Sequence, residues 1–199
     1  MNLKQFCDHY WYKLRDEIPS WWDRYRNWIP SVTTVLSLIV DPGFEWIKKN
    51  NNEQLQNAII RWKKTHADAE SFFNGDIATL HKQILKFHII NSVEIISQEE
   101  RYEKDISWTI DLVASLMLNW VRVEMNIDYK SSLYLNPKYK LQLAWYRYLN
   151  WLDWWLLYLG DKKYIFDYDI WEQEYLIFLE LKNLFFNKMA QWMFEKPRS

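Results

Sequence analysis

An aspartate and a lysine stand two residues apart in the segment Asp128-Tyr129-Lys130, which follows an alternating apolar run. Side chains two residues apart in a strand point to the same face, so the carboxylate and the ammonium are expected side by side. The preceding apolar run, Ile110–Val113, carries a further carboxylate at Asp111. Carboxylates on neighbouring strands can bind a divalent metal through hard oxygen ligands. A lysine beside them can orient water and offset charge on a phosphate, so the spacing indicates metal-assisted phosphoryl chemistry.

Each of these signals also has an ordinary structural explanation. An aspartate at a strand end often forms a turn or is solvated at the rim of the sheet. An Asp–Lys pair in a strand is often a cross-strand ion pair without a catalytic role. The order and spacing of further motifs along the chain therefore decide between a catalytic and a purely structural role for the three residues.

The elements that must position these residues follow from hydrophobic periodicity. Three segments rich in β-branched and aromatic residues predict strands over Val93–Ile96, Ser107–Ala114 and Trp120–Tyr129. A helix over Tyr139–Leu149 is expected next. After it we expect a hairpin of Trp154–Leu159 and Tyr164–Tyr168 around Gly160-Asp161, and a long helix over Trp171–Trp192.

The first half of the chain has helical patterns instead. Helices are expected over 31–40, 44–49, 53–74 and 77–88, with turn residues Asp41-Pro42-Gly43 and Asn74-Gly75-Asp76 between them. We therefore expect one α/β or α+β domain over residues 1–199. Its parts are an irregular segment 1–30 with at most one short helix, a helical part 31–90 and a sheet core 91–199.

Composition narrows the classes of protein. The 199 residues include 14 Trp and 3 Gly, and 49% are hydrophobic, which excludes collagen-like and disordered chains. The net charge of −1 leaves nucleic-acid binding to local basic patches. Cys7 is alone, which excludes an intrachain disulfide and a cysteine-ligated iron–sulfur cluster. No apolar run is long enough to span a membrane and the N-terminus lacks a secretory h-region, so we expect a cytoplasmic protein without membrane association.

Further motifs extend the pattern in both directions. Gln142-x-x-x-Tyr146 follows Lys130, and Arg61-Trp62-Lys63-Lys64-Thr65-His66 precedes Asp111. Earlier still, the segment 29–44 reads IPSVTTVLSLIVDPGF. This series, over residues 29–186, resembles the RecB-like, phage-type exonuclease branch of the PD-(D/E)XK nuclease superfamily, without its iron–sulfur cluster.

The resemblance implies a restriction-endonuclease-like fold, with a central mixed sheet flanked by helices, and Mg²⁺ or Mn²⁺ as cofactor. It assigns His66, Asp111, Asp128 and the backbone carbonyl of Tyr129 to the metal, and imidazole suits Mn²⁺ better than Mg²⁺. The catalytic residues it implies besides the two aspartates are Lys130 and the strand-borne Glu99. Gln142, Tyr146 and Arg61 are the residues implied for substrate.

Some assignments keep alternatives. His81 competes with His66 for the helix histidine, and Glu100 competes with Glu99. The motif glycines of the family are replaced by Trp62 and Trp108, which puts DNA access in question. Surface basic residues are candidates for a phosphate track or are simply solvated helix faces: Lys48, Lys49, Arg61, Lys63, Lys64, Lys82, Lys86, Lys138, Lys140 and Arg147.

The expected function is a metal-dependent deoxyribonuclease, in particular an exonuclease. The resemblance implies recombination, repair or phage DNA processing, in the cytoplasm of a bacterial or phage-infected cell. The alternative is a catalytically impaired member of the superfamily that binds DNA or a protein partner. The sequence leaves homo-oligomerisation open.

Overall fold

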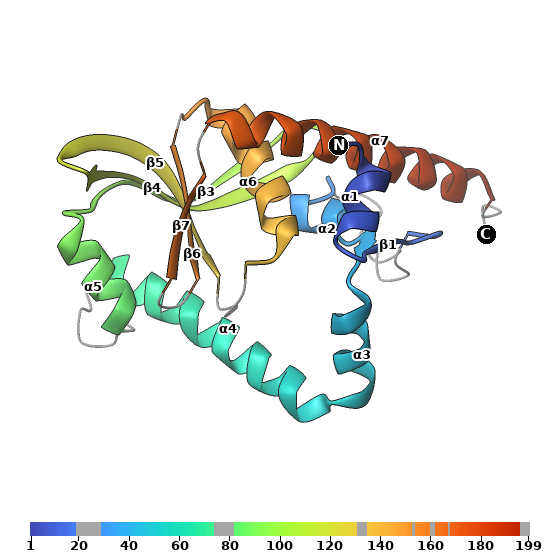
Figure 1. The fold of residues 1–199 in the computed structure, drawn as a ribbon, viewed down its shortest axis with the longest axis horizontal. Helices are drawn as coiled ribbons and strands as arrows, with labels where there is room; N and C mark the ends of the chain where they lie inside the picture. The colour runs from blue at the N-terminus through green and yellow to red at the C-terminus, as the bar shows by residue number, and fades with distance from the viewer. Residues whose placement is uncertain are drawn as a thin grey trace.

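The two periodicities produce a mixed α/β structure in the computed structural model, which describes residues 1–18, 29–73, 82–130, 135–152, 154–159, 162–166 and 168–195 (Figure 1). Its helices are α1 Leu3–His9, α2 Val32–Leu36, α3 Pro42–Asn50, α4 Asn52–Phe73, α5 Lys82–Ile90, α6 Pro137–Asn150 and α7 Tyr168–Glu195. Its strands are β1 Lys13–Leu14, β2 Ile39–Val40, β3 Glu94–Glu103, β4 Ser107–Leu118, β5 Val121–Lys130, β6 Trp154–Leu159 and β7 Lys162–Phe166.

Five of the described strands form one mixed sheet in the order β3-β4-β5-β6-β7. The pairs β3–β4, β4–β5 and β6–β7 are antiparallel, and β5–β6 is parallel. Parallel neighbours need a crossover between them, because a tight turn cannot join strands that run the same way. Helix α6 supplies this crossover, so it lies beside the end of β5.

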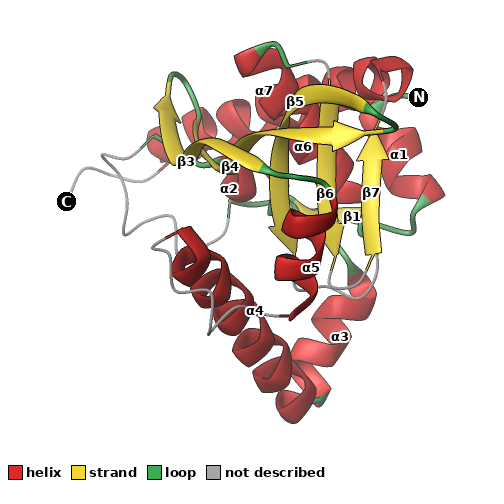
Figure 2. Ribbon diagram, turned by 90° about the vertical axis from the view of Figure 1, so that its left-hand side faces the viewer, coloured by secondary structure: helices red, strands yellow, loops and turns green. Residues whose placement is uncertain are grey.

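Apolar side chains gather in two clusters. Leu112, Ala114, Met125 and Ile127 from β4 and β5 pack with Phe87 of α5. A larger cluster joins α1, α2, α6 and α7 to β4; its largest fully buried side chains are Trp145, Phe178 and Phe185. Figure 2 shows the helices distributed around the twisted strands. The sheet is therefore packed by helices, as the sequence predicts.

The described part of the N-terminal segment, residues 1–18, contains one short helix, as the sequence allowed, and also a short strand that was not expected. Asn2 and Gln5 form a capping box at the start of α1. The Leu3 amide at the same end donates to Glu180 Oε2 of α7 at 2.7 Å. Strand β1 pairs with β2, through Lys13 with Val40 and Leu14 with Ile39.

Several boundaries differ from the prediction. The helix expected over 31–40 ends at Leu36, and Ile39–Val40 is a strand, because β-branched residues there pair with β1. The last strand begins at Lys162, and Tyr168 already belongs to α7. The start expected for α5, at residues 77–81, lies outside the described residues.

No helix in the described ranges is long and apolar enough to cross a lipid bilayer.

Three tryptophans occupy positions that usually belong to glycine. Trp11 follows α1, Trp120 lies in the β4–β5 turn and Trp151 caps α6, with φ of 58°, 68° and 58°. The left-handed region costs a residue with a Cβ roughly 1–2 kcal/mol. Three of the 14 tryptophans therefore stand where the backbone would favour glycine.

Replacing Trp120 by glycine is expected to stabilise the protein. Asn119 and Trp120 both have positive φ and connect directly paired residues, as in a type I′ hairpin, which favours Asn-Gly. Trp120 is 95% exposed, so little packing is lost. We expect Trp120→Gly to raise the free energy of unfolding by about 1 kcal/mol, measured by urea denaturation.

Trp120→Ala is the matched control, because it removes the indole but keeps the Cβ. It is expected to leave the midpoint close to that of the parent. Equal gains from Ala and Gly would show that the indole, and not the backbone, is the source of the effect.

Candidate active site

Three charged side chains lie close together at the C-terminal end of β5. Asp128 and Lys130 form an ion pair, with Lys130 Nζ 2.6 Å from Asp128 Oδ2. The antiparallel register pairs Leu112 with Ile127, and one further step places Asp111 opposite Asp128. Directly opposed residues share a face of the sheet. Asp111 Oδ2 also accepts a hydrogen bond from the Tyr129 amide at 2.8 Å, which fixes its carboxylate beside the strand end.

Lys130 carries its positive charge in a buried place. Only 19% of its side chain is exposed, and Asp128 is buried almost completely. Burial by itself would lower the pKa of Lys130, but the carboxylates of Asp128 and Asp111 outweigh it and leave the pKa above its ordinary value. Lys130 is therefore a fixed cation at neutral pH, suited to stabilising negative charge and not to accepting a proton.

Helix α6 adds a polar pair to this cluster. Gln142 Nε2 donates to the Tyr146 hydroxyl at 2.6 Å, and both residues are buried. Burial first, and the nearby charge of Asp128 next, raise the pKa of Tyr146 well above its ordinary value, against the Gln142 hydrogen bond. Tyr146 is thus a neutral hydroxyl beside the carboxylates. The structure brings together Asp111, Asp128, Lys130, Gln142 and Tyr146, five of the residues that the sequence singled out.

Sequence reasoning missed one neighbour of the lysine. The Tyr139 ring lies 5.3 Å from Lys130 Nζ, within the range of a cation–π contact. Tyr139 stands three residues before Gln142 and seven before Tyr146, which is the spacing of one helix face. That spacing was visible in the sequence and could have added Tyr139 to the cluster.

Two further contacts hold β5 in place. Asn126 and Asn150 exchange side-chain hydrogen bonds of 3.0 and 2.6 Å, which tie the middle of β5 to the end of α6. On β5 between Asp128 and Lys130, the Tyr129 hydroxyl lies 2.6 Å from Nε2 of the buried His88. Burial lowers the pKa of His88 to about 4, so it is neutral near pH 7.

Other predicted residues lie on α4 and β3. His66 falls within α4 and Glu99 and Glu100 within β3, but their side chains, like that of Trp62, are outside the described part of the structure. His81 lies outside the described residues altogether. Arg61 is exposed on α4.

Trp108 is a core residue. It is buried in the larger apolar cluster, with its ring 6.5 Å from that of Trp145 in an edge-to-face arrangement. It fills space between the sheet and α6.

Asp111 and Asp128 are the carboxylates of this cluster that could bind a divalent metal ion. Among the side chains that the structure describes, no three His, Cys, Asp or Glu residues form a metal-binding group. The described pair of carboxylates is nevertheless suited to Mg²⁺ or Mn²⁺, because both groups offer hard oxygens on one face. Within the described residues, the buried Asp128 Oδ2 has no hydrogen-bond partner beyond its contact with Lys130. Asp111 and Asp128 could therefore supply part of the ligand set of a metal ion, and the described side chains include no third ligand beside them.

Comparison with known proteins adds no family. Neither the protein-family models nor the curated proteins that we searched match the sequence. The geometry of the cluster therefore carries the functional interpretation.

Because the ion pair is buried, we expect removing one of its charges to destabilise the protein more than removing both. Lys130→Met leaves the buried Asp128 carboxylate without its counter-charge and is expected to cost about 3–5 kcal/mol in free energy of unfolding. The double variant Asp128→Asn, Lys130→Met removes both charges and is expected to cost distinctly less. Urea denaturation of parent, single and double variants measures this. A double variant whose loss is the sum of the two single losses would contradict the pairing.

The His88 contact predicts a pH-dependent stability. The unfolded chain takes up a proton near pH 6.5, whereas folded His88 does so only near pH 4. Stability from this residue is thus complete above pH 6.5 and is lost as the pH falls towards 4, by up to roughly 3 kcal/mol. His88→Gln keeps a hydrogen-bonding side chain without titration and is expected to flatten the curve in this window. Equal slopes for parent and variant would refute the assignment.

Proposed function

We propose that this protein is a Mg²⁺- or Mn²⁺-dependent deoxyribonuclease of the PD-(D/E)XK superfamily, with a restriction-endonuclease-like sheet. One observation carries the proposal: two carboxylates and a protonated lysine from adjacent strands meet a Gln–Tyr pair from the crossover helix. The mixed sheet flanked by helices agrees with the architecture that the motif order implies. The RecB-like branch, and action as an exonuclease on DNA ends, rest on the sequence resemblance.

Each residue has a role that follows from its surroundings. Asp111 and Asp128 would hold the cation, with His66 and the Tyr129 carbonyl as further ligands implied by the resemblance; the cation would supply an activated water and neutralise phosphate charge. Lys130, held protonated, offers its ammonium to a phosphate oxygen as negative charge develops. Gln142 and Tyr146 offer neutral hydrogen-bonding groups for substrate at the same cluster.

The burial of the cluster favours a second candidate. Asp128, Gln142 and Tyr146 are all buried, and Asp128 is already paired with Lys130. A catalytically impaired member of the superfamily, which binds DNA or a protein partner, also fits this arrangement. Metal-independent DNA binding without any cleavage would favour this candidate.

The activity test uses the full chain with labelled linear and circular DNA and Mn²⁺. We expect the parent to degrade DNA, and Asp128→Asn to reduce the rate by about 100-fold or more because it removes a charged ligand. The double variant Asp128→Asn, Lys130→Met is expected to be equally inactive while remaining folded, which separates loss of chemistry from loss of stability. Degradation of linear DNA alone would show that free ends are required.

Glu124→Gln is the matched control, because Glu124 lies on the same strand but is exposed. It is expected to keep the parent rate. A parent that leaves all DNA intact, or an Asp128→Asn variant as active as the parent, would overturn the proposal.

A further inference from the structure

Helices α3 and α4 form an arm that reaches away from the sheet and returns to it. Figure 1 shows the two helices meeting at an angle, with α4 passing below the lower ends of β5 and β6. The contacts agree, since α4 packs against α3 and against β5. The arm therefore connects an outlying helix to the strand that carries Asp128 and Lys130.

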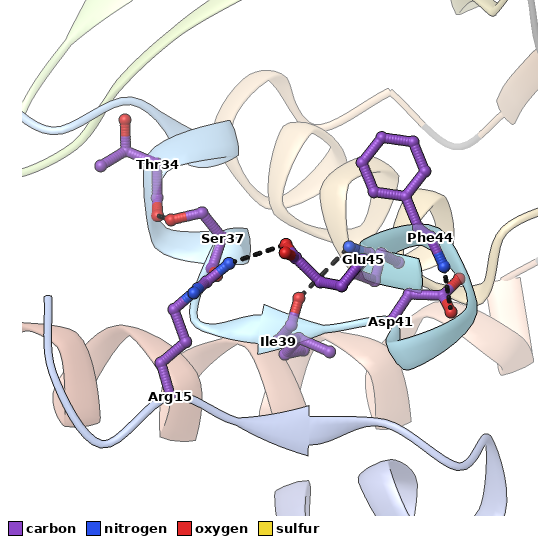
Figure 3. Close-up of polar contacts among 8 residues, drawn as sticks. Arg15, Thr34, Ser37, Ile39, Asp41, Phe44 and Glu45 are labelled. Carbon is purple, nitrogen blue, oxygen red and sulfur yellow. Dashed lines mark hydrogen bonds and ion pairs between the residues drawn. The ribbon is translucent and has the colours of Figure 1, made fainter. Parts of the chain in front are cut away.

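The root of the arm is fixed to the body. Arg15 Nη2 lies 3.0 Å from Glu45 Oε1, and Asp41 caps α3 by accepting a hydrogen bond from the Phe44 amide (Figure 3). Asp41 also accepts a hydrogen bond from the Gly43 amide. Lys138 of α6 donates to the Ile39 carbonyl just before this cap, at 3.3 Å. The start of the arm is therefore attached to the body by these contacts, and its other helix lies against β5.

Helix α3 exposes aromatic side chains without burying any residue. Trp46 is 63% and Phe44 is 50% exposed, and α3 holds no buried residue. Trp46 lines an open hollow of about 570 Å³ together with Glu45, Lys48, Lys49 and Asn50. An indole beside two ammonium groups offers a flat stacking surface and positive charge in one place.

Basic side chains continue along α4. Lys63 and Lys64 are exposed, and their spacing from the exposed Ile60 and Ala67 places all four on one face of α4. Helices α3 and α4 together hold five Lys and Arg against four Asp and Glu, and the basic residues stand in two groups, at 48–49 and 61–64. These two groups are local basic patches on a near-neutral protein, and a local basic patch suits a polyanion.

We propose that the arm binds an unpaired nucleic-acid strand and leads it to the cluster at the end of β5. Trp46 stacks on a base, Lys48 and Lys49 contact the adjoining phosphates, and Lys63 and Lys64 contact phosphates nearer the sheet. An unpaired strand is preferred over a duplex because its bases present free faces for stacking, which is the usual mode of single-strand binding. This inference names the substrate form for the proposed nuclease and rests on it for the chemistry alone.

The test is binding without cleavage. Fluorescence anisotropy is measured with the full chain in EDTA, using a labelled 20-nucleotide oligothymidylate and a labelled 20-base-pair duplex. We expect tighter binding of the single strand, and a loss of about tenfold for Trp46→Ala, because that substitution removes the face on which a base stacks. Trp46→Phe keeps an aromatic face and is expected to recover most of the affinity.

Two controls separate stacking and charge from general effects. Trp11→Ala removes another highly exposed indole, outside the arm, and is expected to bind as the parent does. Lys48→Gln with Lys49→Gln is expected to lower the salt dependence of single-strand binding by roughly 1.4 in the slope of log K against log salt. A parent that binds the duplex as well as the single strand, or a Trp46→Ala variant of unchanged affinity, would overturn the inference.

The outcome is distinct from that of the nuclease test. Single-strand binding that depends on Trp46, in a protein that cleaves no DNA, would leave this inference standing and remove the proposed function. If the protein cleaves DNA but Trp46→Ala leaves its single-strand affinity unchanged, the proposed function stands and this inference is overturned.

Discussion

The buried ion pair between Asp128 and Lys130 is the constraint on which the rest of the site depends. Two opposite charges at the end of a central strand tolerate burial only if they stay paired and properly oriented. The parallel partner β6 requires a crossover, and α6 provides it while placing Gln142 and Tyr146 over the pair. The same geometry raises the pKa of Lys130, because the carboxylates of Asp128 and Asp111 outweigh the effect of burial.

The sequence could predict what depends on local pattern. Period-2 alternation located β5 and placed Asp128 and Lys130 on one face, and helical periodicity located α4 and α6 to within a few residues. It could not show that Ile39–Val40 leave the helix to pair with β1, because that pairing joins residues distant in the chain. His88 was missed for the same reason: an isolated histidine in an apolar helix gives no sign that a tyrosine on β5 contacts it.

The tryptophans also illustrate the difference between pattern and position. The motif alignment suggested that Trp108 takes up space left open by a glycine near the site, whereas its ring packs into the core against Trp145. The positions at which the backbone itself favours glycine lie elsewhere, at Trp11, Trp120 and Trp151, which have positive φ. Backbone conformation, which no composition reveals, is what makes these positions unusual.

Direct Mn²⁺ binding tests, without relying on activity, whether Asp111 and Asp128 form a metal-binding pair. Electron paramagnetic resonance of free Mn²⁺, titrated with the full chain, counts the ions bound. We expect saturable binding by the parent and its loss in a variant with Asp111→Asn and Asp128→Asn, while Glu124→Gln binds as the parent does. Absence of binding by the parent, or unchanged binding by the double variant, would contradict it.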